Sequence, residues 1–254
     1  MTRKETKNEA ARVTPYADDR AKTAQIGSMF DSIAERYDAL NRVISLGLDR
    51  RWRRRAIQML SRRRPGRALD VATGTGDMIV DLHRMLDVDE VTGLDLSAGM
   101  LSLARGRVTK EAPDAQVTLV QGDCASMPFD DDRFDLVTAV FGVRNFEALE
   151  ESLAEMRRVL APGGECLVLE FSRPRGALFR LGFWTYFRTF VPLVGRVLSA
   201  DPAAYRYLPR SVATFPSPGA FRTMLEDAGF GDVTVRPMSN GICTVYLASP
   251  TTSS

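Results

Sequence analysis

The chain has 254 residues, 44% of them hydrophobic, and a formal net charge of +2. This length and apolar content can bury the core of one α/β domain with appended segments. The near-neutral charge does not predict a large nucleic-acid-binding surface. Three cysteines without a Cys-x-x-Cys pair and a single histidine predict neither a disulfide framework nor a zinc site, and favour a reducing cytoplasm.

The first 64 residues precede any strand-like segment. Residues 1–24 are polar and lack the apolar core of a secretory signal, so we expect a flexible leader. Residues 25–64 have helical patterning and form a predicted helical cap on the substrate side. One part of it has an apolar face made by Leu48, Trp52, Ala56 and Met59. Its opposite face, rich in arginine, is either solvated or attracted to anionic lipid.

Strand-like and helix-like segments alternate from residue 67 onward, which indicates a parallel sheet covered on both faces. The last two strands are joined only by Ser-Asn-Gly-Ile, a sign of an antiparallel hairpin. The predicted strands are 67–72, 90–96, 116–121, 134–142, 165–172, 232–238 and 243–249, and the predicted helices 77–86, 98–110, 147–160 and 217–228. We therefore predict an α/β, Rossmann-like domain over residues 65–254, with a mostly parallel seven-stranded sheet and an antiparallel C-terminal hairpin.

A long insertion, residues 173–216, separates the fifth predicted strand from the last helix. Segments of this length in compact domains usually have a function. Its Phe- and Leu-rich part is interrupted by arginine, proline and glycine, so it does not predict a membrane span. It is either a helix packed on the flank of the domain or a lid over the site.

A glycine turn, RALDVATGTGD at residues 67–77, ends the first strand and opens a helix. Open parallel sheets bind ligands at the carboxyl ends of their strands, and glycines let the backbone approach a ligand. Gly74 and Gly76 match the first two glycines of a dinucleotide fingerprint, but Ile79 occupies the third position, which disfavours NAD. No Gly-Lys-Ser/Thr follows, which excludes a P-loop.

Two aspartates follow the next two strands. Asp95 ends the second strand, where its carboxylate can accept both hydroxyls of a ribose, and Asp123 follows the third, where it can accept an amino hydrogen such as that of adenine. Either aspartate by itself is more often a helix cap. Together and in this order they predict an adenosine-containing ligand without a pyrophosphate.

The ordered segments LDVATGTGD, GLDLS, QGDCASMPF, FDLVTAVFGVRN, RVLAPGG and LVLEFS resemble the class I S-adenosylmethionine (SAM)-dependent methyltransferases. The flanking segments MFDSIAERYDALNRVISLGLDRRWRR and DPAAYRYLPRSVATFPSP resemble one branch, the C-methyltransferases of menaquinone and ubiquinone biosynthesis. The resemblance covers residues 28–248 and implies a class I methyltransferase fold. It also implies C-methylation of a demethylated polyprenyl quinol, with the insertion as a lid that accepts the isoprenoid tail.

The resemblance assigns the SAM contacts residue by residue, and it implies no metal. Val140 stands where the family has a serine contact, and Cys124 is expected to contribute its backbone N–H rather than its thiol. The expected SAM-binding residues are Asp70, Gly74, Thr75, Gly76, Asp95, Asp123 and Cys124.

Residues 141–145, FGVRN, leave the fourth strand beside the expected methyl group. We expect Arg144 to stabilise a developing phenolate and Asn145 to orient it or the methionine moiety. The alternative for Arg144 is a structural pair with an acid such as Glu147. Expected substrate contacts are Tyr37, Tyr205 and Tyr207, whereas His83 is expected at the surface.

The resemblance favours 2-demethylmenaquinol as the substrate, in the last step of menaquinone biosynthesis. The ubiquinone-precursor benzoquinol, or both quinols, stays open as an alternative. Two other classes of function are weaker alternatives. A nucleotide-dependent dehydrogenase is disfavoured because Ile79 replaces the third glycine and no substrate domain with a catalytic histidine is found, and the other is a non-catalytic SAM-binding scaffold. We expect a cytoplasmic protein, peripheral on the inner face of the membrane, without nucleic acid. Whether it forms a homodimer is left open.

Overall fold

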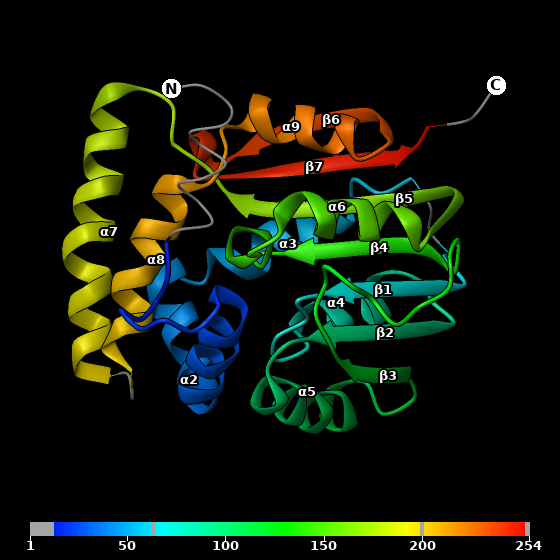
Figure 1. Cartoon of the computed structure of the whole chain (residues 1–254), viewed down its shortest axis with the longest axis horizontal. Coiled ribbons are helices and arrows are strands. Elements are labelled where there is room, and N and C mark those ends of the chain that lie inside the picture. Colours follow the sequence, from blue (N-terminus) through cyan, green and yellow to red (C-terminus); the bar gives the residue numbers. More distant parts are fainter. Residues whose placement is uncertain (1–12, 62–63, 199–200, 252–254) are drawn as a thin grey trace.

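The computed structural model describes residues 13–61, 64–198 and 201–251, without the side chains of residues 197 and 198. Its centre is a seven-stranded sheet in the order β3-β2-β1-β4-β5-β7-β6 (Figure 1). The strands are β1 Arg67–Val71, β2 Glu90–Asp95, β3 Gln116–Gln121, β4 Phe134–Val140, β5 Leu160–Phe171, β6 Phe230–Met238 and β7 Cys243–Pro250. The strands from β3 to β5 are parallel neighbours, and β7 pairs antiparallel with both β5 and β6. The predicted mixed sheet and C-terminal hairpin are confirmed.

Helices lie on both faces of the sheet and beyond one of its ends. The described α-helices are α2 Lys22–Ser45, α3 Leu48–Ile57, α4 Asp77–Met85, α5 Ala98–Glu111, α6 Leu149–Arg158, α7 Ala177–Leu198, α8 Pro202–Thr214 and α9 Pro218–Asp227. Two 3₁₀ turns, η1 Val143–Asn145 and η2 Ser239–Gly241, follow β4 and β6. All four predicted helices of the domain are present, within two residues of the expected bounds.

Side chains alternate between two cores along the central strands, as the two-residue period of a strand requires. Leu69 and Val71 of β1 pack with α6 and α9 on one face. Ala68 of the same strand packs with α3 and α4 on the other face. The sheet is thus the middle of three layers, and the strands read as continuous apolar runs because both of their faces are buried.

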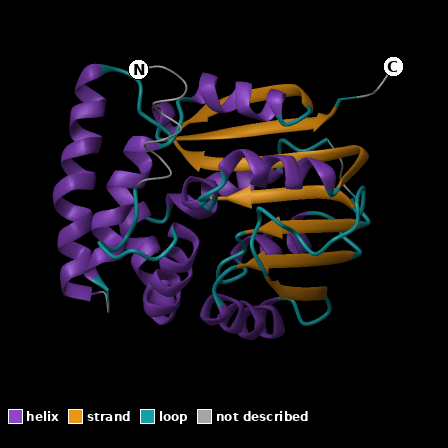
Figure 2. Cartoon of the chain, viewed as in Figure 1, coloured by secondary structure: helices purple, strands orange, loops and turns teal. Residues whose placement is uncertain are grey.

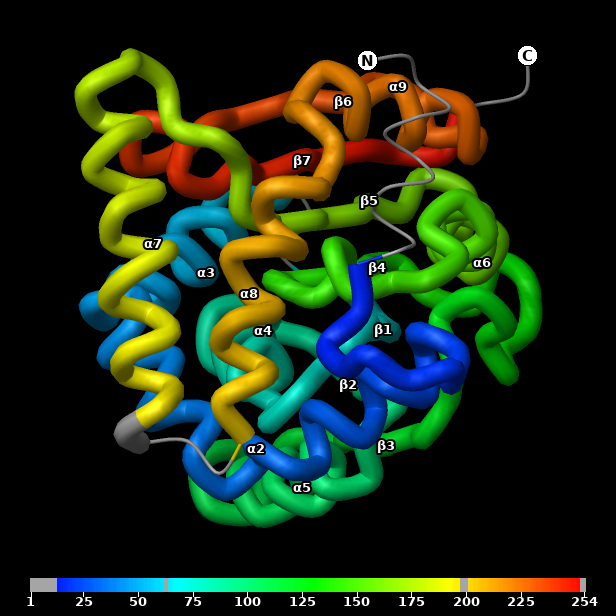
Figure 3. The backbone as a smooth tube through the Cα atoms, turned by 60° about the vertical axis from the view of Figure 1, so that its left-hand side comes forward, coloured from blue at the N-terminus to red at the C-terminus, as the bar shows by residue number. Residues whose placement is uncertain are grey.

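A third apolar cluster joins α2, α7 and α8, with Ile33, Phe187 and Tyr205 among its members. Figures 1 and 2 show these helices together, beyond the end of the sheet to which the arrowheads of β1, β2, β4 and β5 point. Figure 3 shows α7 and α8 side by side, in agreement with their mutual contacts. The insertion 173–216 is therefore a helical pair that stands over the carboxyl ends of the parallel strands.

The start of the fifth strand and the start of the first helix differ most from the sequence-based prediction. The fifth strand begins at Leu160 rather than residue 165, because Leu160 already pairs with Phe134 of β4, before an irregularity in the register that ends at Glu165. Helix α2 begins at Lys22. The described part of the leader is tied down before that point, since Tyr16 N–H donates to Gln25 Oε1 at 3.0 Å and its hydroxyl to Asp201. Residues 1–12 lie outside the described residues.

Helix α7 is apolar on much of its surface, but neither it nor any other described helix combines the length and the hydropathy that crossing a bilayer requires.

Two glycines of α7 should respond in opposite ways to alanine. A Cβ at Gly195 would lie 2.3 Å from Tyr205 Cβ, whereas one at Gly182 would meet nothing within 4 Å. Gly195→Ala should therefore push α8 away and lower the free energy of unfolding by about 1–3 kcal/mol. Gly182→Ala should raise it by roughly 0.5–1 kcal/mol, because alanine is the better helix former. Urea unfolding of both variants measures this, and equal shifts would contradict the packing of α7 on α8.

Candidate functional site

The strand order reverses between β1 and β4, and the site lies at that reversal. β1 is followed by β2 on one side, while β4 is followed by β5 on the other, so the loops that leave β1 and β4 diverge. A crevice opens where neighbouring parallel strands send their connections in opposite directions. The loop after β1 contains the glycine turn, and the loop after β4 contains residues 141–145.

The two loops touch through unusually small residues. Ala72 has a φ of +54° and Gly74 a φ of +56°, a left-handed conformation that glycine adopts at little cost. A Cβ on Gly142 would lie 2.6 Å from Ala72 Cβ. The alanine at residue 72 therefore requires a glycine at residue 142, and together they let the backbones of the two loops close on the crevice.

One cavity of the crevice, which we term the strand-end pocket, lies at the ends of β1 to β4. Gly74, Asp95, Asp123, Cys124 and Asn145 line it. Asp95 is buried; its Oδ2 accepts from Gly74 N–H at 2.8 Å and its Oδ1 from Ser97 N–H at 2.9 Å. These bonds fix the carboxylate and leave further lone pairs for a ligand. Burial raises the pKa of Asp95, and the hydrogen bonds from the two backbone N–H groups partly offset this increase.

The next two residues of the pocket differ in what their side chains do. Asp123 Oδ1 accepts from Ala125 N–H at 2.9 Å, which holds the carboxylate at the wall. The Cys124 thiol lies 3.3 Å from Ser152 Oγ, and burial raises its pKa to about 12. A thiol with that pKa stays protonated at neutral pH, so it is no nucleophile there.

A second cavity, which we term the arginine chamber, adjoins the first and shares Tyr37, Gly74 and Phe141 with it. Thr75 and Asp70 line this chamber and not the strand-end pocket. Gly76 lines neither cavity; its φ is +80° and it begins α4 against Ala104. The residues of the glycine turn are thus divided between two adjoining cavities.

Asp70 is fully enclosed at the end of β1. Its Oδ2 accepts from Thr73 Oγ1 at 2.6 Å and its Oδ1 from Thr138 Oγ1 at 2.7 Å. Burial raises its pKa to about 6, and the two hydroxyl donors oppose that shift. Asp70 thereby joins β1 to β4 directly below the turn.

Arg144 forms a buried ion pair with Glu170, at the end of β5. Arg144 Nη1 lies 2.9 Å from Glu170 Oε1, and the backbone N–H of Arg144 donates to Oε2 at 3.1 Å. Nη1 also donates to the carbonyl of Phe141. The guanidinium lies 5.4 Å from the ring centroid of Phe171. Its Nε is buried and has no hydrogen-bond partner among the described residues.

The structural alternative for Arg144 named the wrong acid. Glu147 instead accepts from the backbone N–H of Thr23, at 2.6 Å, and so anchors the start of α2. The acid that does pair with Arg144 comes from the neighbouring strand. Asn145, next to Arg144, lines the strand-end pocket, and its Oδ1 is buried without a partner among the described residues.

The three tyrosines occupy different places. Tyr37 lines both cavities; burial raises its pKa, and the charge of Arg144 opposes this. Burial also raises the pKa of Tyr207, on which Arg144 and Glu170 act as well, and its hydroxyl has no hydrogen-bond partner among the described residues. Tyr205 packs against Gly195 in the α7–α8 contact and lines neither cavity. His83 is half-buried, 3.2 Å from Asp114.

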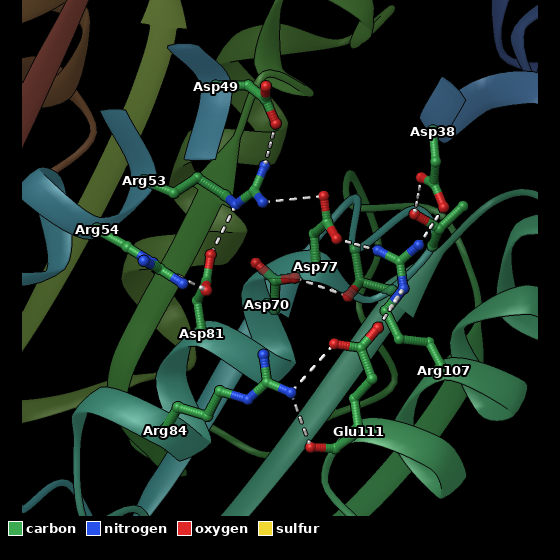
Figure 4. A network of polar contacts seen from close by, with 12 residues as sticks. Asp38, Asp49, Arg53, Arg54, Asp70, Asp77, Asp81, Arg84, Arg107 and Glu111 are labelled. Atoms are coloured by element: carbon green, nitrogen blue, oxygen red, sulfur yellow. Dashed lines mark hydrogen bonds and ion pairs between the residues drawn. The ribbon is translucent and has the colours of Figure 1, made fainter. Parts of the chain in front are cut away.

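Helix α2 closes the crevice from above and is held by charged residues. Thr75 Oγ1 donates to Asp38 at 2.7 Å, and Asp38 also pairs with Arg107 of α5. Arg107 pairs with Asp77, whose other oxygen lies 3.0 Å from Arg53. Figure 4 shows this chain of ion pairs, with Asp77 between the two arginines. The network connects α2, α3 and α5 to the start of α4.

Sequence reasoning missed Glu170 and Asp38. Glu170 could have been identified from the sequence, because it is an acid near the end of the predicted strand that follows residues 141–145 in the chain. Asp38 could not have been identified in this way, because it lies within an amphipathic helix, whose exposed face normally has charged residues.

The proteins that match this chain in sequence or in fold include several named as methyltransferases. The model of the ubiE/COQ5 methyltransferase family matches residues 18–249. A protein of Bacteroides fragilis named demethylmenaquinone methyltransferase is 40% identical over 238 residues, 94% of this chain and 97% of its own. A ubiquinone/menaquinone biosynthesis C-methyltransferase of Geobacter sulfurreducens is 42% identical over 89% of this chain and 88% of its own.

A solved structure of a SAM-dependent methyltransferase from Thermotoga maritima has a TM-score of 0.62 at 17% identity, over 88% of this chain and 99% of its own. The sheet order and the crevice at its reversal thus define a class I SAM-dependent methyltransferase fold. Within that class, the chain belongs to the ubiE/COQ5 methyltransferase family.

The raised pKa of Asp70 should make stability depend on pH. A carboxyl whose folded pKa of about 6 exceeds its unfolded value favours the folded state at low pH, and this contribution is lost as pH rises through 6. From about pH 4 to pH 7 this single group should lower the free energy of unfolding by about 2 kcal/mol. Urea unfolding of Asp70→Asn should lack that part of the slope. The exposed Asp130→Asn variant is the control, and a slope unchanged by Asp70→Asn would contradict the assignment.

Proposed function

We propose that this protein transfers a methyl group from SAM to a ring carbon of 2-demethylmenaquinol and thereby forms menaquinol. The observation that carries the proposal is the Arg144–Glu170 pair, which places a buried cation with an unpaired Nε on the wall of the arginine chamber, beside the strand-end pocket. The names of relatives about 40% identical over nearly the whole chain support the substrate class.

The residues of the strand-end pocket suit an adenosine. Asp95 and Asp123 offer carboxylate oxygens to the ribose and to the amino group of the base. The unpaired Oδ1 of Asn145 is a buried acceptor in the same wall, as a polar ligand requires. Thr75 and Gly74 line the adjoining chamber, and we assign them to the methionine end.

Helix α2 must move for this ligand to enter. The strand-end pocket has an accessible volume of about 60 Å³, and Ile26, Phe30 and Tyr37 of α2 form part of its wall. Pockets for ligands of drug-like size hold roughly 300–1,000 Å³. We therefore propose that the bonds of Thr75 and Arg107 to Asp38 form the closed state and open during exchange of the ligand.

SAM supplies an electrophilic methyl group on a sulfonium. The quinol ring supplies the electron pair for the new C–C bond, and its carbon becomes nucleophilic as the adjacent hydroxyl loses a proton. The bond between the methyl group and sulfur breaks, and its electron pair stays on the sulfur of S-adenosylhomocysteine. The hydrogen of the methylated carbon then leaves as a proton and the oxygen takes one back, so one proton is released overall. Arg144 stabilises the developing phenolate through its free Nε. Glu170 acts through Arg144, because it fixes both the backbone and the guanidinium of that residue.

This arrangement also favours carbon over oxygen as the methylated atom. A phenolate oxygen held by Arg144 is oriented away from the methyl group, and its lone pairs are engaged in a charge-assisted bond. Tyr207, whose hydroxyl has no described partner near the pair, is a second candidate contact for that oxygen. Tyr37, between the two cavities, is a candidate contact for the ring.

Loss of the cation should affect the chemical step selectively. Arg144→Leu should lower kcat by about 10²-fold or more, since it removes a charge that acts on the transition state. The SAM affinity, measured by calorimetry, should change by less than about threefold. The exposed Arg105→Leu on α5 is the control.

Arg144→Leu leaves Glu170 as an unpaired buried acid, so its fold needs a check of its own. The double variant Arg144→Leu/Glu170→Gln removes that charge and should show the same selective loss of kcat. An unchanged kcat in either variant would exclude Arg144 from the mechanism.

We further propose a peripheral association with an anionic membrane surface, because a polyprenyl quinol resides in the bilayer. Exposed arginines of α3 lie beside Leu46, whose side chain is 72% exposed. Arg53 is not part of this surface, since it is buried in pairs with Asp49, Asp77 and Asp81. The exposed set is Arg50, Arg51, Arg54 and Arg55.

Charge reversal on α3 should weaken binding to anionic vesicles. Each exposed arginine near an anionic surface contributes about 1 kcal/mol. Arg51→Glu/Arg55→Glu should therefore lower the fraction that co-sediments with phosphatidylglycerol vesicles, while Arg105→Glu should not. Equal co-sedimentation of the wild type with neutral and anionic vesicles would contradict the proposal.

The benzoquinol precursor of ubiquinone is the second candidate substrate, favoured by the relative named for both pathways. Incubation of the protein with labelled SAM and each demethylated quinol separates the two. Transfer to neither quinol would leave the non-catalytic scaffold as the better explanation.

A further inference from the structure

A large apolar groove lies beside the arginine chamber, outside the cavities described so far. It runs between the end of α2, the start of α3 and the first half of α7, and its volume is about 760 Å³. That is within the roughly 300–1,000 Å³ of small-molecule sites. Arg175 is the one charged side chain among the described residues that line it. Aromatic residues dominate the wall: Trp52, Phe171, Phe179, Phe183, Tyr186 and Phe187.

The groove is continuous with the arginine chamber. Ile44, Ser45 and Phe171 line both. Phe171 has the guanidinium of Arg144 on its chamber side and contacts Phe187, an aromatic residue of the groove, with ring centroids 5.9 Å apart. A molecule that spans both cavities would therefore meet a cation at one end and aromatic and aliphatic surface along the rest.

We propose that this groove binds the prenyl chain of the quinol while the ring lies in the arginine chamber. This rests on the proposed function and adds the site of the tail. A quinol with an isoprenoid chain is polar at its ring oxygens and apolar along its chain. The path from Arg144 past Phe171 into the groove changes from charged to apolar in the same order. Burial of hydrocarbon against such a wall is favourable in proportion to the area removed from water.

The outer end of the groove also suits a chain that continues into a bilayer. Leu46 and Leu178, both in its wall, are 72% and 84% exposed. Leu181, on the same turn of α7, is 65% exposed. A second copy of the chain or a flat membrane surface could cover this rim, but neither would require an apolar path that reaches Phe171. The first isoprene units should therefore bind in the groove, and later units should leave it past the exposed leucines.

Gly182 offers a way to fill the groove without touching the chemistry. It lines the groove, and a Cβ there meets nothing within 4 Å. Gly182→Phe should lower kcat/KM for a diprenylated 2-demethylnaphthoquinol by about tenfold. The ring without a chain should be methylated at the wild-type rate. Gly106→Phe, on a helix with equally open space around its glycine, is the matched control.

A loss of kcat/KM that is equal for the two substrates would overturn the groove as the tail site. So would an unchanged kcat/KM for the prenylated quinol in Gly182→Phe. Methylation of neither substrate by the wild type would instead count against the proposed function, which is a different result from either of these.

A binding measurement tests the groove without turnover. The chain has two tryptophans, and Trp52 lines the groove whereas Trp184 does not. In a Trp184→Phe background, a brominated fatty alcohol should quench the fluorescence of Trp52 in a saturable way. Adding Gly182→Phe should remove that quenching, and adding Gly106→Phe should not. Quenching that is absent in Trp184→Phe, or that persists with Gly182→Phe, would overturn the proposal.

Discussion

Strands β1 and β4 are neighbours in the sheet although two strands separate them in the chain, and the site depends on this reversal. It makes the loops after β1 and β4 leave in opposite directions from adjacent strand ends. Asp70 joins the two strands from within, through the hydroxyls of Thr73 and Thr138. Because Ala72 and Gly142 are small, the loops also close on one another, and both adjoining cavities share this floor.

A network of charges connects helices around that floor, in addition to their apolar contacts. Arg53 and Arg107 lie on either side of Asp77, so the start of α4 is tied to α3 and α5 at once. Asp38 extends the same network to α2 and ends it on the Thr75 hydroxyl. Removal of one partner from the buried pair of Arg53 and Asp81 should cost about 3–5 kcal/mol, because a charge is left without compensation. An exposed partner such as Asp38 contributes less, which suits a helix that must open.

The cavities form a gradient of polarity across the top of the sheet. Carboxylates line the strand-end pocket, a cation paired with a buried acid lines the chamber, and aromatic rings line the groove beyond Phe171. The first suits a nucleoside, the second a phenolate and the third a hydrocarbon chain. The insertion 173–216 supplies most of the groove, which accounts for its length in a domain that otherwise has short connections.

The sequence alone determined the sheet, the helices that cover it and the aspartates of the strand-end pocket. These features depend on short-range patterns: apolar strands of fixed period, glycine turns, and acids that follow strand ends. Arg144 and Asn145 could be named for the same reason, since their strand end was visible. The tertiary structure decided which acid pairs with Arg144, because Glu170 lies 26 residues away on a neighbouring strand. It also placed Tyr205 in the contact between α7 and α8, and Phe171 between two cavities. These positions depend on packing between residues that are far apart in the chain, which local sequence patterns do not predict.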